Sequence, residues 1–92
     1  MKTIRWTAHA LQKITNREVD TYTVEHILEH PDTVQWASAT RQFYQGRYFD
    51  ETLNTEMLLR VLVDESDTVK FIITLYKTSK FKKYEADSAN EN

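Results

Sequence analysis

The sequence predicts an α+β domain with a short N-terminal strand, then two helices, then an antiparallel sheet of three or four strands. Up to Pro31, apolar residues recur at helical spacing, and after Pro31 they alternate with a period of two. The polar segment 64–67 separates the two longest alternating stretches and predicts a hairpin. At 92 residues, the chain has the length of one domain.

The first two elements are short. Residues 3–7, TIRWT, are expected to form a strand. Thr7 can then cap a helix whose apolar side carries Leu11 and Ile14 at i, i+3, and which ends near residue 17. A helix of this length depends on packing for its stability.

A second helix follows, capped by Thr21 or Thr23 and stopped by Pro31. It contains HILEH, residues 26–30, which matches the inverted zinc-protease signature. Zinc needs a third protein ligand, and the chain has no cysteine and one further histidine. We therefore expect no metal site, and we expect these histidines to lie on the solvated side or at the helix C-terminus.

The sheet is predicted from alternating segments after Pro31. These segments are residues 33–37, 41–49, 56–65 and 68–78. One face of the last two is apolar and should pack under the helices; it carries Leu59, Val61, Val63, Val69, Phe71, Ile73 and Leu75. The opposite face includes Arg60, Thr74 and Tyr76, so we expect that face to be partly open to water.

The charge of the chain is distributed unevenly, with an acidic segment from residue 85 onward. The overall net charge is −2, but residues 85–92 hold three acids and no base, which is typical of a disordered acidic tail. The remaining residues 1–84, the expected domain, hold 12 basic and 11 acidic residues. Four lysines within 77–83 form a basic patch that can hold phosphates, or that protects a strand end from edge pairing.

Composition also limits cofactors and location. Without cysteine, neither disulfides nor thiolate metal sites can form. No apolar stretch approaches the roughly 20 residues of a membrane span, and the N-terminus lacks the apolar run of a signal peptide. We expect a cytoplasmic protein with no cofactor and no membrane partner.

A row of His9, Lys13 and Arg17 lies along one side of the first helix, at i, i+4 and i+8. If this helix lies along the end of the sheet, the row meets Arg60 and Tyr76. RNA cleavage by transesterification needs a base, an acid and cations, but no metal. In that hypothesis His9 is the acid or base, the three cations bind phosphate, and Tyr76 donates a proton or orients the substrate. The alternative is an ordinary polar helix face.

Further polar residues follow at the end of the last strand and would bind RNA. They are Thr74, Thr78, Ser79, Lys80 and Lys83. Aromatic residues at positions 43, 44, 48 and 49 can stack on unpaired bases, or they pack in the core and across strands.

Three motifs resemble a small, mostly bacterial domain family of unknown function. They are the opening IRWTAHALQKITNREV (with Trp6, Thr7, His9, Ala10, Ile14, Arg17 and Val19), HILEHPD, and TLYKTSKFKKY (with Thr74, Tyr76 and Thr78). That family is similar in layout to the RelE, barnase and colicin-nuclease (BECR) group of small RNases, many of them toxins of toxin–antitoxin pairs.

The resemblance implies a RelE-like domain that acts as a toxin-type endoribonuclease on single-stranded RNA. It carries over His9 and Arg17 as site residues, and it implies a small antitoxin as protein partner. The alternative is a non-catalytic protein- or RNA-binding module on the same scaffold.

Overall fold

The computed structural model describes residues 2–16 and 19–89 and confirms the α+β class. In chain order the elements are β1 (Thr3–Trp6), α1 (Ala8–Thr15), α2 (Thr21–Glu29), β2 (Thr33–Trp36), β3 (Arg41–Asp50), β4 (Thr55–Glu65), β5 (Val69–Thr78) and α3 (Phe81–Ala89).

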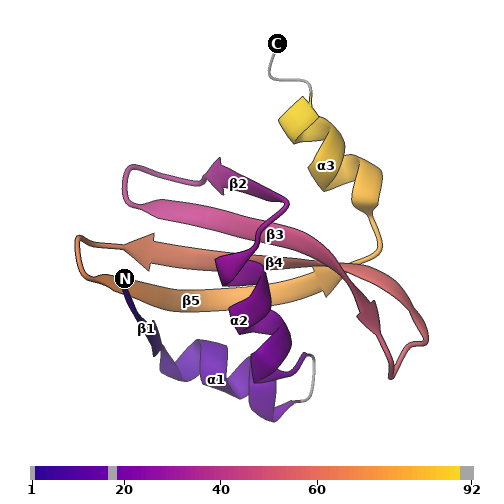
Figure 1. Cartoon of the computed structure of the whole chain (residues 1–92), viewed down its shortest axis with the longest axis horizontal. Helices are drawn as coiled ribbons and strands as arrows, with labels where there is room; N and C mark the ends of the chain where they lie inside the picture. The colour runs from indigo at the N-terminus through magenta and orange to yellow at the C-terminus, as the bar shows by residue number, and fades with distance from the viewer. Residues whose placement is uncertain (1, 17–18, 90–92) are drawn as a thin grey trace.

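The strands form one five-stranded sheet in the order β1-β5-β4-β3-β2 (Figure 1). The three neighbouring pairs from β2 to β5 are antiparallel, as predicted. The sheet has one strand more than predicted, because β1 adds to β5 in parallel, with Thr3 opposite Val69. Strands β1 and β2 are therefore its two edges.

Helices α1 and α2 cover one face of the sheet, which we call the helix face (Figure 1). Thr7 caps α1, as predicted: its hydroxyl accepts the N–H of Ala10 and also donates to the carbonyl of Ile72, 2.7 Å away. This pair of bonds fixes the start of α1 against β5. Asp20, and neither predicted threonine, caps α2 by accepting the N–H of Thr23 at 2.7 Å.

The core lies between these helices and the sheet. Its buried members include Ala10 from α1 and residues from α2, β4 and β5, namely Val24, Ile27, Leu28, Leu59, Val61, Val63, Ile72 and Leu75. The predicted core side of β4 is thereby confirmed.

On β5, the face assignment is wrong for the first half of the strand. A bulge in the β4–β5 pairing leaves Leu62 opposite Thr74 but Val63 opposite Ile72, so Ile73 has no partner across the ladder. An extra residue shifts which side chains point to a given face. Ile72 is fully buried in the core, whereas Ile73, the predicted core residue, is half-buried.

Helix α3 runs to Ala89 and so extends past residue 85, where the sequence predicts the start of a disordered tail. Residues 90–92 lie outside the described part of the chain. The carboxylate of Glu85 accepts two bonds from the Arg47 guanidinium, at 2.7 and 2.9 Å, and the same guanidinium lies 4.1 Å from the ring of Phe81. These contacts with β3 hold a helix whose own apolar pattern is weak.

Candidate functional site

The predicted row on α1 lies on the side of the sheet that carries the core. Ala10 is buried and Ile14 packs against the core, and they leave His9 exposed and Lys13 half-buried. Arg17 lies outside the described residues. Among the residues that the structure describes, the His9 side chain makes no hydrogen bond or ion pair.

Arg60 and Tyr76 lie on the opposite face of the sheet, directly across from each other on β4 and β5. We call this surface the α3 face, because side chains of α3 pack on it. The strand alternation that buries Leu59 and Val61 under the helices points Arg60 the other way. The structure therefore brings Arg60 and Tyr76 together but does not bring His9 to them.

Arg60 is 7% exposed and is held by neutral acceptors. Its Nε donates to Gln45 at 2.9 Å, one Nη donates to Gln35 at 2.8 Å, and the other Nη donates to the hydroxyl of Tyr76. In the described part of the chain no carboxylate pairs with it. A buried charge without a counter-ion is costly, so these three bonds and the surrounding rings must stabilise it.

Aromatic rings supply the rest of that environment. The guanidinium carbon of Arg60 lies 4.0 Å from the ring centroid of Phe43 and 4.3 Å from that of Tyr84. Such cation–π contacts stabilise by about 0.5–2 kcal/mol, more when they are shielded from water. From the sequence, Phe43 was predicted either to stack on a base or to pack within the protein. In the structure its ring packs against the Arg60 guanidinium. Arg60 thereby joins β4 to α3.

Tyr76 and Tyr84 lie next to each other at the border of this cluster, with their ring centroids 6.1 Å apart. Burial and the neighbouring Tyr84 hydroxyl raise the pKa of Tyr76, although the hydrogen bond from Arg60 lowers it. The neighbouring Tyr76 hydroxyl and the ammonium of Lys83 lower the pKa of Tyr84, against an opposing effect of burial. Both side chains are half-buried and Lys83 is exposed. Two phenols with opposite pKa shifts therefore lie next to an exposed cation.

The other predicted RNA-binding residues continue from this pair toward α3. Thr74 is half-buried on the same face, opposite Leu62. Thr78 ends β5, and its hydroxyl accepts the N–H of Lys80 at 3.0 Å, which shapes the turn into α3. Ser79 and Lys80 are exposed. The predicted set thus follows one path along β5 and into α3.

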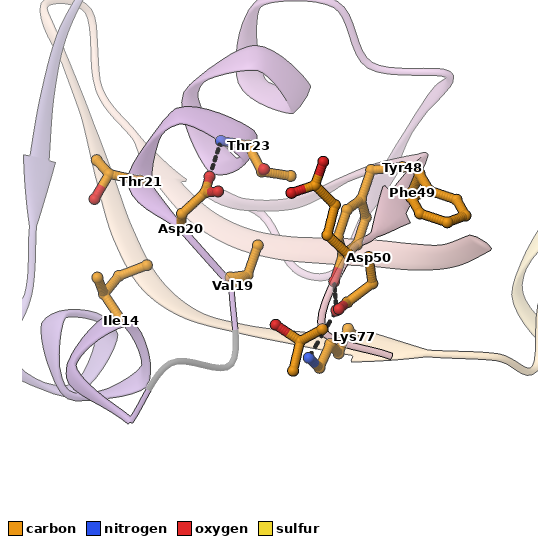
Figure 2. Close-up of a pocket in the computed structure, with 11 residues that line it drawn as sticks. Ile14, Val19, Asp20, Thr21, Thr23, Tyr48, Phe49, Asp50 and Lys77 are labelled. Atoms are coloured by element: carbon orange, nitrogen blue, oxygen red, sulfur yellow. Dashed lines mark hydrogen bonds and ion pairs between the residues drawn. The ribbon is translucent and has the colours of Figure 1, made fainter. Parts of the chain in front are cut away.

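A separate cleft of about 490 Å³ opens on the helix face (Figure 2). It lies between the end of α1, the start of α2 and the ends of β3 and β5. At its floor Asp50, 6% exposed, accepts from Lys77 at 2.8 Å and from the Tyr48 hydroxyl at 2.9 Å. The Lys77 bond above all lowers the pKa of Asp50 to about 2. This ion pair links the end of β3 to β5, which lies two strands away in the sheet.

Sequence reasoning missed the groups that surround Arg60. Gln35 and Gln45 belong to no motif, and Tyr84, the last residue of TLYKTSKFKKY, lies in a helix that was not predicted. A pattern that could have found one of them is the alternation on β3, which places Gln45 on the same face as Arg60 in the neighbouring strand.

The HILEH histidines lie on α2 as expected. His26 is exposed between Tyr22 and His30, with ring centroids 6.2 and 5.2 Å away, and His30 ends the helix. Across residues 2–16 and 19–89, no three histidine, aspartate or glutamate side chains are grouped as metal ligands. In the same residues, no helix combines the length and apolarity that a membrane crossing requires.

Comparison with protein families matches residues 6–77 to the family described as "Domain of unknown function (DUF4258)". The match includes the α1 row, Arg60 and Tyr76, and ends before α3. Curated proteins give no match, and solved structures give none either.

Proposed function

Because the chain belongs to the DUF4258 family, whose description gives no activity, we propose a function from the α3 face: metal-independent cleavage of single-stranded RNA. The observation that carries the proposal is the tyrosine pair, Tyr76 and Tyr84, held by Arg60 beside Lys83. This is the toxin-type endoribonuclease activity that the similarity to the RelE, barnase and colicin-nuclease group implies, with a small antitoxin protein as its partner.

The two phenols supply both proton transfers of a transesterification. Tyr84, whose pKa is lowered, acts in its ionised phenolate form: it takes the proton of the ribose 2′-OH and becomes a neutral phenol, and the 2′ oxygen attacks phosphorus. The bond from phosphorus to the 5′ oxygen breaks, and Tyr76 gives its proton to that oxygen. Transfer of a proton from the neutral Tyr84 to the neighbouring Tyr76 phenolate restores the starting state of the pair. The products are a 2′,3′-cyclic phosphate and a 5′-hydroxyl.

The cations have different roles in this scheme. Lys80 and Lys83 are exposed, so they can contact phosphate and stabilise the added negative charge. Arg60 is too buried to be reached directly; it is a positioning residue that holds Tyr76 by a hydrogen bond and Tyr84 by stacking. His9 lies on the other side of the sheet, and its participation is the competing form of the proposal.

A non-catalytic RNA-binding module is the second candidate. It is favoured by the position of α3, which covers part of the face and leaves the tyrosines half-buried. In that case the lysines at the start of α3 bind phosphates, and no proton is transferred.

Cleavage of a 5′-labelled single-stranded RNA in EDTA, with and without ribosomes, tests the proposal. Tyr84→Phe and Tyr76→Phe should each lower the rate by about 10²–10⁴, the usual effect of losing a proton-transfer group, with binding changed only a few-fold. His9→Ala is the matched control and should cleave normally. Lys83→Ala should weaken binding and reduce its salt dependence.

Each other outcome assigns a different function. Loss of cleavage in His9→Ala with activity kept in both phenylalanine variants would place the chemistry on α1. Wild-type protein that binds RNA but never cleaves it would support the binding module. Protein that does neither would refute both candidates.

A further inference from the structure

The two edges of the sheet differ in how they are protected. On β1, Lys2 precedes the strand and pairs with Glu65, and Arg5 is exposed within it. Charges of this kind discourage a second strand from pairing. Edge strand β2, Thr33–Trp36, contains no charge, proline or glycine. Its Val34 and Trp36 are 41% and 70% exposed.

The hydrogen-bond alternation shows where the backbone of β2 points. The N–H of Ala37 donates to the carbonyl of Arg41, so every second residue from there back along β2, including Gln35, bonds to β3. Val34 and Trp36 lie between those positions. Their N–H and C=O groups therefore point away from β3, to the open edge. Val34 and Trp36 therefore combine exposed apolar side chains with backbone N–H and C=O groups that point to the open edge.

We infer that this edge pairs antiparallel with β2 of a second copy of the chain, with Val34 of each copy opposite Trp36 of the other. This register is self-complementary: the two-fold axis passes at Gln35, and four intermolecular backbone hydrogen bonds form. It also places a β-branched side chain opposite an aromatic one twice, a favourable cross-strand pair. A shift by two residues would lose half of these matches.

The pairing joins the two sheets into one of ten strands. A two-fold axis perpendicular to an antiparallel strand pair keeps like faces on the same side. The α3 faces of both copies then form one surface, with Gln35, which binds Arg60, next to the axis in each. In the single chain α3 contacts the sheet face through Gln35, Arg47 and Arg60, and it does not pair with the edge.

Sedimentation velocity of the full chain over a concentration series tests this inference. Wild type should shift from monomer to dimer as concentration rises, because a four-residue strand pair makes a small interface. Val34→Pro removes one outward N–H without touching the β3 ladder and should stay monomeric. Trp36→Lys should do the same by placing a charge at the edge. Leu53→Lys, also an exposed apolar residue but in the β3–β4 turn, should dimerise normally.

Hydrogen exchange gives a second readout that does not depend on any RNA activity. The Val34 and Trp36 amides should gain protection as concentration rises, while circular dichroism shows the variants folded. If wild type stays monomeric at the highest soluble concentration, the inference is wrong. It is also wrong if Leu53→Lys abolishes dimerisation while Trp36→Lys retains it.

Discussion

Replacing Ile72 by alanine tests the β-bulge, which determines that Ile72 and not Ile73 faces the core. Ile72 is fully buried in the core, so the change removes three carbons from a closed environment. At about 0.8 kcal/mol for each buried methylene, the transfer loss is roughly 2.4 kcal/mol. The cavity left behind raises the expected cost to about 3–4 kcal/mol. Ile73→Ala is the matched control: half-buried and without a ladder partner, it should cost about 1 kcal/mol.

Urea titration at constant pH measures both variants. For a domain of this size 1 kcal/mol corresponds to about 4–8 °C, so Ile72→Ala should lower the melting temperature by at least about 12 °C. Equal slopes of the urea transitions would show that neither change alters the surface exposed on unfolding. If Ile73→Ala proved the more costly, the regular alternation predicted from sequence would be right and the bulge wrong.

Three further predictions concern other parts of the domain. Because the pKa of Asp50 is lowered to about 2 from an ordinary 3.8, its pairing with Lys77 stabilises the fold above about pH 4, and that contribution should be lost as pH falls toward 2. Lys77→Met should destabilise at pH 7 and flatten this acid dependence in urea titrations. Deleting residues 85–92 removes an exposed ion pair and should cost no more than about 1 kcal/mol by thermal melting; a much larger loss would show that α3 is part of the core. A Cβ at Gly46 would come within 2.7 Å of the buried Ile27 side chain, so Gly46→Ala should cost about 1–3 kcal/mol through overpacking, and an unchanged melting temperature would refute this.

Local chemistry in the sequence was enough to predict much of the fold. The Thr7 cap follows from one hydroxyl before an apolar helical pattern, and the faces of β4 follow from its strict alternation. On β5 the same reasoning failed, because Ile72 and Ile73 are equally apolar and either register looks satisfactory. The choice depends on pairing with β4, which is a tertiary contact.

The candidate site likewise contains residues whose positions could be predicted from the sequence and residues whose positions could not. Arg60 and Tyr76 were placed on one face because strand alternation relates them directly. His9 was expected beside them, but the position of its helix is set by the burial of Ala10 and by the Thr7 bond to β5, which connect distant parts of the chain. Helix α3 escaped prediction since its stability comes from contacts with arginines on other strands.

The parallel pairing of β1 with β5 constrains the order in which the strands of this domain can pair during folding. The bond from Thr7 to Ile72 spans 65 residues, so the first strand made is among the last to gain its neighbour. Long-range pairings of this kind slow folding, because loop closure comes before the contact that compensates for it. During synthesis the hairpins from β2 to β5 can form as they emerge. The N-terminal strand must wait, unpaired, until almost the whole domain has left the ribosome.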